Sequence, residues 1–110
     1  MSDFLPSTKF INVARTVTGT VYVEDSDQVL NCDTTSGAVT VNLKKIPANY
    51  RSTFYKLYVK DYGNNASVNN ITIVAPTGYK INGAQSVVIS VSDGCCLVTI
   101  NTNTDYLADF

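Results

Sequence analysis

Hydrophobic and polar residues alternate with a period of two along most of this chain, a pattern typical of β-strands with one buried face. The alternation is clearest at residues 38–43, where Val39, Val41 and Leu43 are separated by polar residues. The pattern predicts eight or nine short strands, at residues 10–17, 20–24, 28–32, 38–43, 54–61, 71–75, 79–82, 85–91 and 96–101. The apolar residues expected to share one core are Val39, Val41, Leu43, Leu57, Val59, Ile71, Ile73, Val87, Ile89, Val98 and Ile100.

Short polar segments rich in Asn, Asp, Ser and Gly separate these strands, as turns require. Asp93-Gly94 is a dipeptide of tight turns and predicts a hairpin between the last two strands. Short strands at this spacing predict an all-β fold, an antiparallel β-sandwich that is jelly-roll-like or Ig-like, or else a small barrel. We find no internal repeat or linker. We therefore expect a single domain with an N-terminal arm (1–9), a core (10–101) and a C-terminal tail (102–110).

Composition narrows the chemistry that the chain can support. It contains no His, which excludes a His-based triad, a His-ligated zinc site and a His general base. Its net charge is −1 and it has no basic patch, so nucleic acid is not an expected partner. The chain has no run of about 18 apolar residues, so the sequence predicts no membrane-spanning helix. Because the N-terminus does not resemble a secretory signal, we expect synthesis in a cytoplasm.

The three cysteines and the only helix candidate complete this picture. Cys95 and Cys96 are adjacent and Cys32 is alone, a spacing that fits neither a disulfide framework nor a CxxC motif. We interpret all three as small apolar strand residues. Residues 46–52 are the only segment that could form a helix, and it would be one or two turns long.

Two charged clusters could bind ligands. The acidic cluster could bind calcium through carboxylate oxygens, although its spacing does not match an EF-hand loop. Its members are Glu24, Asp25, Asp27 and Asp33. The basic cluster could bind phosphate or an acidic partner surface, and its members are Lys44, Lys45 and Arg51. We prefer a solvated loop for both, and predict no catalytic residue, no metal site and no cofactor.

Three segments resemble tailed-bacteriophage fibre and head-decoration proteins. They are residues 31–43 (NCDTTSGAVTVNL), 55–73 (YKLYVKDYGNNASVNNITI) and 78–91 (GYKINGAQSVVISV). The most specific part is Lys60-Asp61 followed by the run from Asn69 to Ile73. The resemblance implies a small β-sandwich domain of a virion, often homotrimeric, that serves in attachment or capsid decoration.

The chain departs from that pattern in two ways. Many such fibres have Leu-Pro at the end of the first strand, whereas Leu43 is followed here by Lys44-Lys45-Ile46-Pro47. Those fibres are also long chains of many domains. A single module with short arms favours an accessory or decoration subunit over a whole tail fibre.

Two groups of residues are candidates for partner binding. Apolar residues near the ends of the chain could anchor it to a sister chain or a capsid shell, although the N-terminal arm could instead lie across its own domain. These residues are Phe4, Leu5, Tyr106, Leu107 and Phe110. Tyrosines form a second group that could contact glycans or a protein partner. These residues are Tyr50, Tyr58, Tyr62 and Tyr79.

Two functions of different classes follow. The first is a non-enzymatic bacteriophage virion protein, an auxiliary capsid (head-decoration) or head-fibre subunit. It would bind the major capsid protein, other virion proteins or sister subunits, with a homotrimer favoured, and would reach the virion from the host cytoplasm. The alternative is a tail-fibre or baseplate adhesin, or a carbohydrate-binding module, that contacts host glycans. That alternative requires the tyrosines to form one exposed platform.

Overall fold

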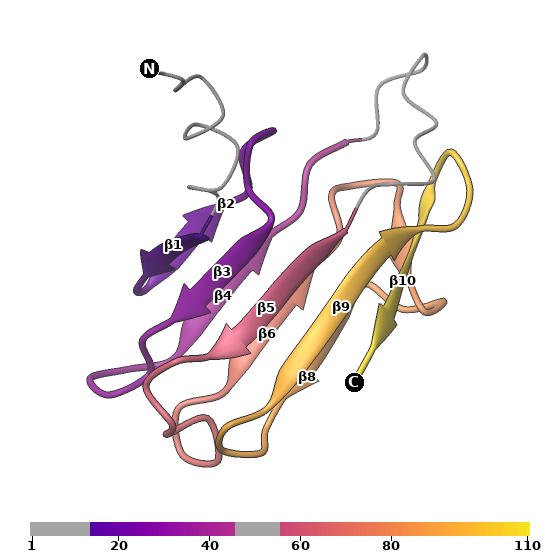
Figure 1. The fold of residues 1–110 in the computed structure, drawn as a ribbon. Coiled ribbons are helices and arrows are strands. Elements are labelled where there is room, and N and C mark those ends of the chain that lie inside the picture. Colours follow the sequence, from indigo (N-terminus) through magenta and orange to yellow (C-terminus); the bar gives the residue numbers. More distant parts are fainter. Residues whose placement is uncertain (1–13, 46–55) are drawn as a thin grey trace, which may run out of the picture.

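The computed structural model describes residues 14–45 and 56–110, which form β-strands and connecting loops (Figure 1). The described residues contain ten strands in two sheets. The strands are β1 (Ala14–Val17), β2 (Thr20–Tyr22), β3 (Val29–Cys32), β4 (Val39–Asn42), β5 (Leu57–Asp61), β6 (Ile71–Val74), β7 (Lys80–Ile81), β8 (Ser86–Ile89), β9 (Cys95–Ile100) and β10 (Asp105–Asp109). Within these two ranges no helix is long and apolar enough to cross a membrane.

The first six strands form a flattened coil, because the chain alternates between the two sheets. The six-stranded sheet has the order β1-β3-β5-β9-β10-β7, and the four-stranded sheet has the order β2-β4-β6-β8. Strands β1, β3 and β5 are parallel neighbours in one sheet, and β2, β4 and β6 are parallel neighbours in the other. Each turn of the coil therefore adds one strand to each sheet, and the chain completes three turns before β7 (Figure 1).

The later strands close the two sheets with antiparallel pairs. Strand β8 runs antiparallel to β6, and β9 runs antiparallel to both β5 and β10. Strand β7 then pairs in parallel with β10 at the edge of the six-stranded sheet. The middle of the six-stranded sheet is thus built from β5, near residue 60, and from β9 and β10, between residues 95 and 109.

The expected all-β, two-layer fold is confirmed, but the expected antiparallel pairing is wrong for the first half of the chain. The parallel pairs leave neither a jelly-roll-like nor an Ig-like topology confirmed. Alternation with a period of two indicates which face of a strand is buried, and it is the same whether the neighbouring strand is parallel or antiparallel. The short connections between the first six strands step from one sheet to the other.

The hairpin predicted at Asp93-Gly94 is wrong, because the two strands that it would join are not neighbours in one sheet. Strands β8 and β9 lie in different sheets, so the segment between them is a crossover. The positive φ of this segment belongs to Asp93, at 65°. A Cβ on Gly94 would lie 2.7 Å from the Ile89 side chain and 2.8 Å from the Val91 carbonyl oxygen. Gly94 is therefore required by close packing rather than by its backbone conformation.

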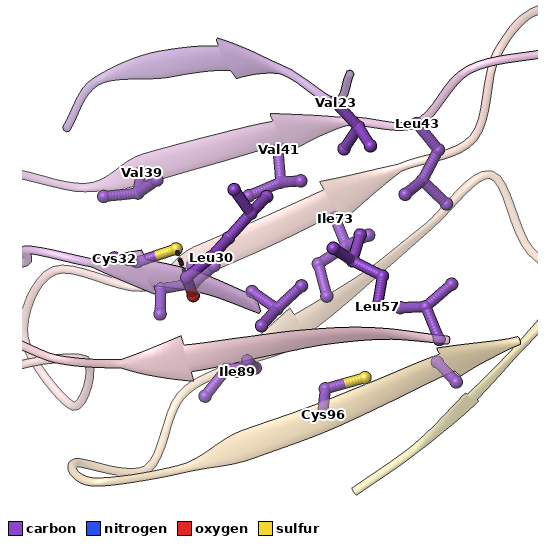
Figure 2. Close-up of a cluster of buried hydrophobic side chains, with 14 of the residues drawn as sticks. Val23, Leu30, Cys32, Val39, Val41, Leu43, Leu57, Ile73, Ile89 and Cys96 are labelled. Carbon is purple, nitrogen blue, oxygen red and sulfur yellow. Dashed lines mark hydrogen bonds between the residues drawn. The ribbon is translucent and has the colours of Figure 1, made fainter. Parts of the chain in front are cut away.

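The core lies between the sheets, and its predicted composition is confirmed (Figure 2). Residues at the same register stack across the turns of the coil, as Val21, Val41 and Ile73 do. Each fully buried aliphatic side chain of this kind contributes roughly 1.5–3 kcal/mol. The buried residues among those predicted are Val39, Val41, Leu43, Leu57, Val59, Ile71, Ile73, Ile89 and Val98, and Val87 and Ile100 pack against them partly buried.

The C-terminal residues are part of the sheet, which corrects the expectation of a tail at residues 102–110. Strand β10 lies between β9 and β7. Tyr106 is only 3% exposed, and its hydroxyl donates a hydrogen bond to the carbonyl oxygen of Lys44. The alternation of buried Tyr106 and Ala108 with exposed Leu107 is present in the sequence. It covers only five residues, and the polar residues 101–104 before it hide it.

Several expectations concern parts of the chain outside the described residues. These are the N-terminal arm (1–9), the helix candidate at 46–52, and the starts of two predicted strands at 10–13 and 54–55.

Candidate interaction surface

Three loops meet around a buried aspartate at one end of the sheets. Asp61, the last residue of β5, is 1% exposed. Its carboxylate accepts hydrogen bonds from Thr34 Oγ1 at 2.6 Å and from the backbone amides of Ala66 and Asp93, both at 2.9 Å. These donors belong to the β3–β4, β5–β6 and β8–β9 loops. One carboxylate therefore holds all three loops together.

This arrangement keeps Asp61 ionised. Burial by itself would raise the pKa of Asp61, but the hydrogen bonds from Thr34 and from the backbone amides outweigh burial and hold that pKa below its usual value. Thr34 is fully buried, and its carbonyl oxygen accepts a hydrogen bond from Asn69 Nδ2 at 2.8 Å. A Cβ on Gly63 would lie 2.5 Å from the Thr34 backbone nitrogen. Of the residues in this loop cluster, Thr34, Asp61, Gly63, Ala66 and Asn69 lie within the segments that carry the phage resemblance, and Asp93 lies outside them.

The acidic cluster predicted from the sequence does not converge on one point. Asp27 is 6% exposed and forms a two-pronged ion pair with Arg15, from Nε to Oδ1 at 3.0 Å and from Nη2 to Oδ2 at 2.7 Å. Asp25 pairs with Lys44, and Asp33 accepts hydrogen bonds from Thr35. Among the described residues, no group of three or more His, Cys, Asp or Glu side chains is placed to hold a metal ion.

The ion pair of Asp27 closes the first turn of the coil. Arg15 is in register with the buried Leu30 of the neighbouring strand, so its side chain covers the end of the core. Burial would raise the pKa of Asp27. The hydrogen bonds from Arg15 and from the Glu24 amide outweigh it and hold that pKa below its usual value. Asp27 is therefore an internal partner for Arg15.

The outer face of the six-stranded sheet carries apolar side chains on several neighbouring strands. Val29, Tyr58 and Leu97 are in register across β3, β5 and β9, and Thr99 is in register with Leu107 on β10. Tyr58 is 42% exposed and Leu107 is 44% exposed. We call these five residues the six-strand face. It is a regular, continuous surface of mixed apolar and hydroxyl groups, open to a partner.

Charged residues on this face are divided by β9, which lies between β5 and β10 (Figure 1). Lys56 and Lys60 lie on the β5 side, and Lys60 Nζ is 3.2 Å from Asp93 Oδ1 in the β8–β9 loop. Asp105 and Asp109 lie on β10, and Lys80 of β7 is in register with Asp105, so that the β5 side keeps a net positive charge and the β10 side a net negative charge. Positive and negative charge therefore face outward on opposite sides of a central strand.

Cys95 lies at the start of β9 and faces outward with the six-strand face. It is exposed and in register with Lys60, whereas the other two cysteines of the chain are buried. Burial is the main reason that the pKa of Cys32 is raised to about 12 and that of Cys96 to about 11. At neutral pH these two thiols are protonated, so Cys95 is the cysteine accessible to reagents.

The outer face of the four-stranded sheet is of a different kind. Thr20, Thr40 and Thr72 form a row of hydroxyl groups in register across β2, β4 and β6. Tyr22 on β2 is 70% exposed and Val88 on β8 is 45% exposed. We call these five residues the four-strand face. Its apolar groups are at its two edges, with the threonine row between them.

The structure separates most of the residues that sequence reasoning had grouped for partner binding. Tyr58 and Leu107 lie on the six-strand face. Tyr62 is in the β5–β6 loop, beyond the Cys95 end of β9, while Tyr79 packs on the buried Tyr106 near the Ile100 end, with ring centroids 6.4 Å apart. These two ends of β9 are about 17 Å apart. The described tyrosines therefore do not form a single platform.

The other candidate residues lie at the end of the chain or outside the described residues. Phe110 follows β10 and is 63% exposed. Phe4, Leu5 and Tyr50 lie outside the described residues. Sequence reasoning missed Val29 and Leu97 because it assigned one buried face to each strand. Residues 95–100 (CCLVTI) contain the signal for an apolar outer face. Apolar residues at successive positions place apolar side chains on both faces of the strand.

Comparison with protein-family models and with curated proteins found no match for this chain. Both buried carboxylates are hydrogen-bonded within the protein, whereas the six-strand face presents large side chains to solvent.

Proposed function

We propose that the chain is a non-enzymatic structural subunit of a bacteriophage virion, a head-decoration or head-fibre protein that binds other virion proteins through the six-strand face. The observation that carries the proposal is the exposure of Tyr58 and Leu107 on a regular sheet surface that also carries Leu97. Large apolar side chains with charges at their margin are characteristic of protein interfaces. The assignment to a phage rests on the resemblance in residues 31–43, 55–73 and 78–91.

The internal chemistry supports a passive role. Hydrogen bonds keep the pKa values of Asp61 and Asp27 low. A carboxylate that stays ionised and bonded to its own protein is poorly suited to proton transfer near neutral pH. These two residues instead hold loops in place, so that the sheet faces are presented by a rigid body. A rigid face can bind many equivalent positions on a symmetric shell without rearranging.

The proposed partner is the major capsid protein or another virion protein. Of the terminal residues expected to anchor the chain, Leu107 contributes to the six-strand face and Phe110 lies just beyond it in sequence. Tyr106 contributes to the core instead. The glycan-binding alternative receives no comparable support, because Tyr58, Tyr62 and Tyr79 lie apart.

The test is whether the protein belongs to particles. Phage particles from the virus that encodes the chain would be purified by density gradient and analysed by quantitative mass spectrometry. We expect its peptides to co-sediment with the major capsid protein at a constant ratio. Recovery only in the soluble fraction would overturn the proposal.

Matched variants then test the surface. Tyr58→Ser combined with Leu107→Ser should reduce incorporation at least tenfold, because it removes the two most exposed apolar side chains of the six-strand face. Tyr22→Ser changes a tyrosine on the opposite face that is even more exposed, at 70%, and should leave incorporation unchanged. Circular dichroism and a melting curve for each variant confirm that it folds. Equal incorporation of all variants would show that another surface binds the particle.

A further inference from the structure

We propose that the six-strand face also binds a second copy of this chain, with β9 of the two copies lying along a common two-fold axis. This deepens the proposed function, because it names one partner of the same face. The proposal rests on how charge is distributed about β9 and on where the exposed cysteine lies.

The charge distribution selects one way of pairing two such faces. Strands β5 and β10 are the immediate neighbours of β9 on either side, each about 4.8 Å away. A two-fold axis parallel to β9 places β5 of one copy over β10 of the other. The Lys56 and Lys60 side of each copy then faces the Asp105 and Asp109 side of its partner, and this complementarity occurs twice.

The other face-to-face arrangement is electrostatically unfavourable. A two-fold axis perpendicular to the strands would place β5 over β5, and β10 over β10. Lysines would then face lysines and aspartates would face aspartates, and like charges brought together at an interface oppose association. The apolar centre, formed by Tyr58, Leu97 and Leu107, would be covered in either arrangement. The charges therefore decide the geometry.

The size of the face sets the expected affinity. The strands that overlap about this axis are β3, β5, β9, β10 and β7, which contain 22 residues together and give a face of about 360 Å² for each copy. Stable specific complexes bury about 800 Å² per partner. We therefore expect a concentration-dependent dimer in the micromolar range.

Cys95 provides a test of the geometry in the native protein. Because β9 lies on the proposed axis, Cys95 of one copy faces Cys95 of the other. Packed sheets are about 10 Å apart, which is too far for a disulfide, so the probe is a bis-maleimide with a short spacer. We expect a covalent dimer of the unmodified protein at micromolar concentration, and none after Cys95→Ser.

Two relocated cysteines control for random collision. Thr99→Cys with Cys95→Ser moves the thiol along β9, still on the axis, and should restore the covalent dimer. Thr16→Cys with Cys95→Ser moves it to β1, three strands away on the same face. In the proposed dimer the two Thr16 positions are about 29 Å apart, so no covalent dimer should form. Equal cross-linking from positions 16 and 99 would overturn the proposed axis.

Charge reversal tests the complementarity independently. Lys56→Glu with Lys60→Glu, or Asp105→Lys with Asp109→Lys, should each weaken the dimer at least tenfold in sedimentation equilibrium. Mixing the two variants should restore association as a heterodimer, because every opposed pair is again of opposite charge. Melting curves of each variant identify any that does not fold, and the cross-linking test stands without them.

The outcomes separate this inference from the proposed function. A monomer at all concentrations, or a trimer, overturns the two-fold pairing. If incorporation into particles still depends on Tyr58 and Leu107, the proposed function stands without it. If the dimer forms but the protein is absent from particles, the proposed function fails and the pairing stands.

Discussion

The loop cluster around Asp61 and the first turn of the coil both depend on a buried carboxylate, but the two carboxylates are satisfied differently. Asp61 accepts hydrogen bonds from one hydroxyl and two backbone amides, all uncharged, that come from three loops. Asp27 is paired with the cation of Arg15, whose side chain is 34% exposed. Asp61 therefore joins loops that are distant in the sequence, whereas Asp27 fixes the first turn of the coil at the edge of its sheet. The comparison indicates that neutral donors from several segments can stabilise an ionised group as a cation does.

The largest effect is expected when Asp61 is removed. Asp61→Ala leaves the Thr34 hydroxyl and two amides without their acceptor, at about 1–3 kcal/mol each. We therefore expect the free energy of unfolding, measured by urea titration, to fall by at least about 3 kcal/mol. Asp93→Asn keeps the amide that bonds to Asp61 and removes only an exposed carboxylate and its ion pair with Lys60, which contributes little at the surface, so it serves as the control. A loss below about 1 kcal/mol for Asp61→Ala would contradict the assigned role.

Gly63 tests the same cluster without altering a hydrogen-bonding side chain. Gly63→Ala places a Cβ within 2.5 Å of the Thr34 backbone nitrogen, so the β3–β4 and β5–β6 loops must move apart. We expect a loss of about 2–3 kcal/mol in the same urea assay. At Gly37 a Cβ would meet nothing within 4 Å, and Gly37→Ala is the matched control. Equal stability of the two variants would show that the loops adjust freely.

A smaller effect is expected at the Arg15 ion pair. Arg15→Met keeps most of the aliphatic stem over the core but leaves Asp27 buried without its cation. Because solvent screens the partly exposed guanidinium, we expect a loss of about 1–2 kcal/mol. High salt should reduce the difference between this variant and the unmodified protein, while leaving the effect of Asp61→Ala nearly unchanged. If salt changed the stability loss of Arg15→Met and of Asp61→Ala equally, the proposed difference between an ion pair at Asp27 and neutral hydrogen bonds at Asp61 would be wrong.

The dependence of stability on pH should follow from both carboxylates. Their pKa values lie below the usual 3.8 in the folded protein. Each therefore contributes stability that is present above about pH 4 and lost as the pH falls through its folded pKa. The chain has no His, so stability should be nearly constant between about pH 5 and pH 8. Urea titrations from about pH 2 to about pH 8 should show a drop in stability only below about pH 4, and a shallower drop for Asp61→Ala.

The strands and the core were largely predictable from the sequence, whereas the pairing of the strands was not. Val39, Val41 and Leu43 are buried as expected because local alternation decides which face of a strand meets the core. Alternation carries no information about the neighbouring strand, so the parallel coil was missed. Its turns also differ in length. Val29 follows Ala14 by 15 positions, and Tyr58 follows Val29 by 29 positions, so no internal repeat is visible.

The candidate surface was predictable only in part. Tyr58 and Leu107 were identified, but Tyr106 was placed outside the core because the strand that contains it is short and follows the polar residues 101–104. Asp61 and Asp27 look like ordinary surface residues in the sequence. Their burial depends on partners 27 and 12 residues away, Thr34 and Arg15 respectively. Contacts at such separations are set by the three-dimensional fold and leave no local pattern.

The order of strands in the six-stranded sheet also has a consequence for how the chain folds as it is synthesised. Strand β9 pairs with β5 across 39 positions, from Tyr58 to Leu97, whereas it pairs with β10 across a connection of only four residues, 101–104. Closing a longer loop costs more chain entropy, about 0.6 kcal/mol for each doubling of its length. We expect the β9–β10 hairpin to form early and to recruit β5. Until β9 and β10 have left the ribosome, β5 is therefore an edge strand whose backbone groups on that side have no partner strand.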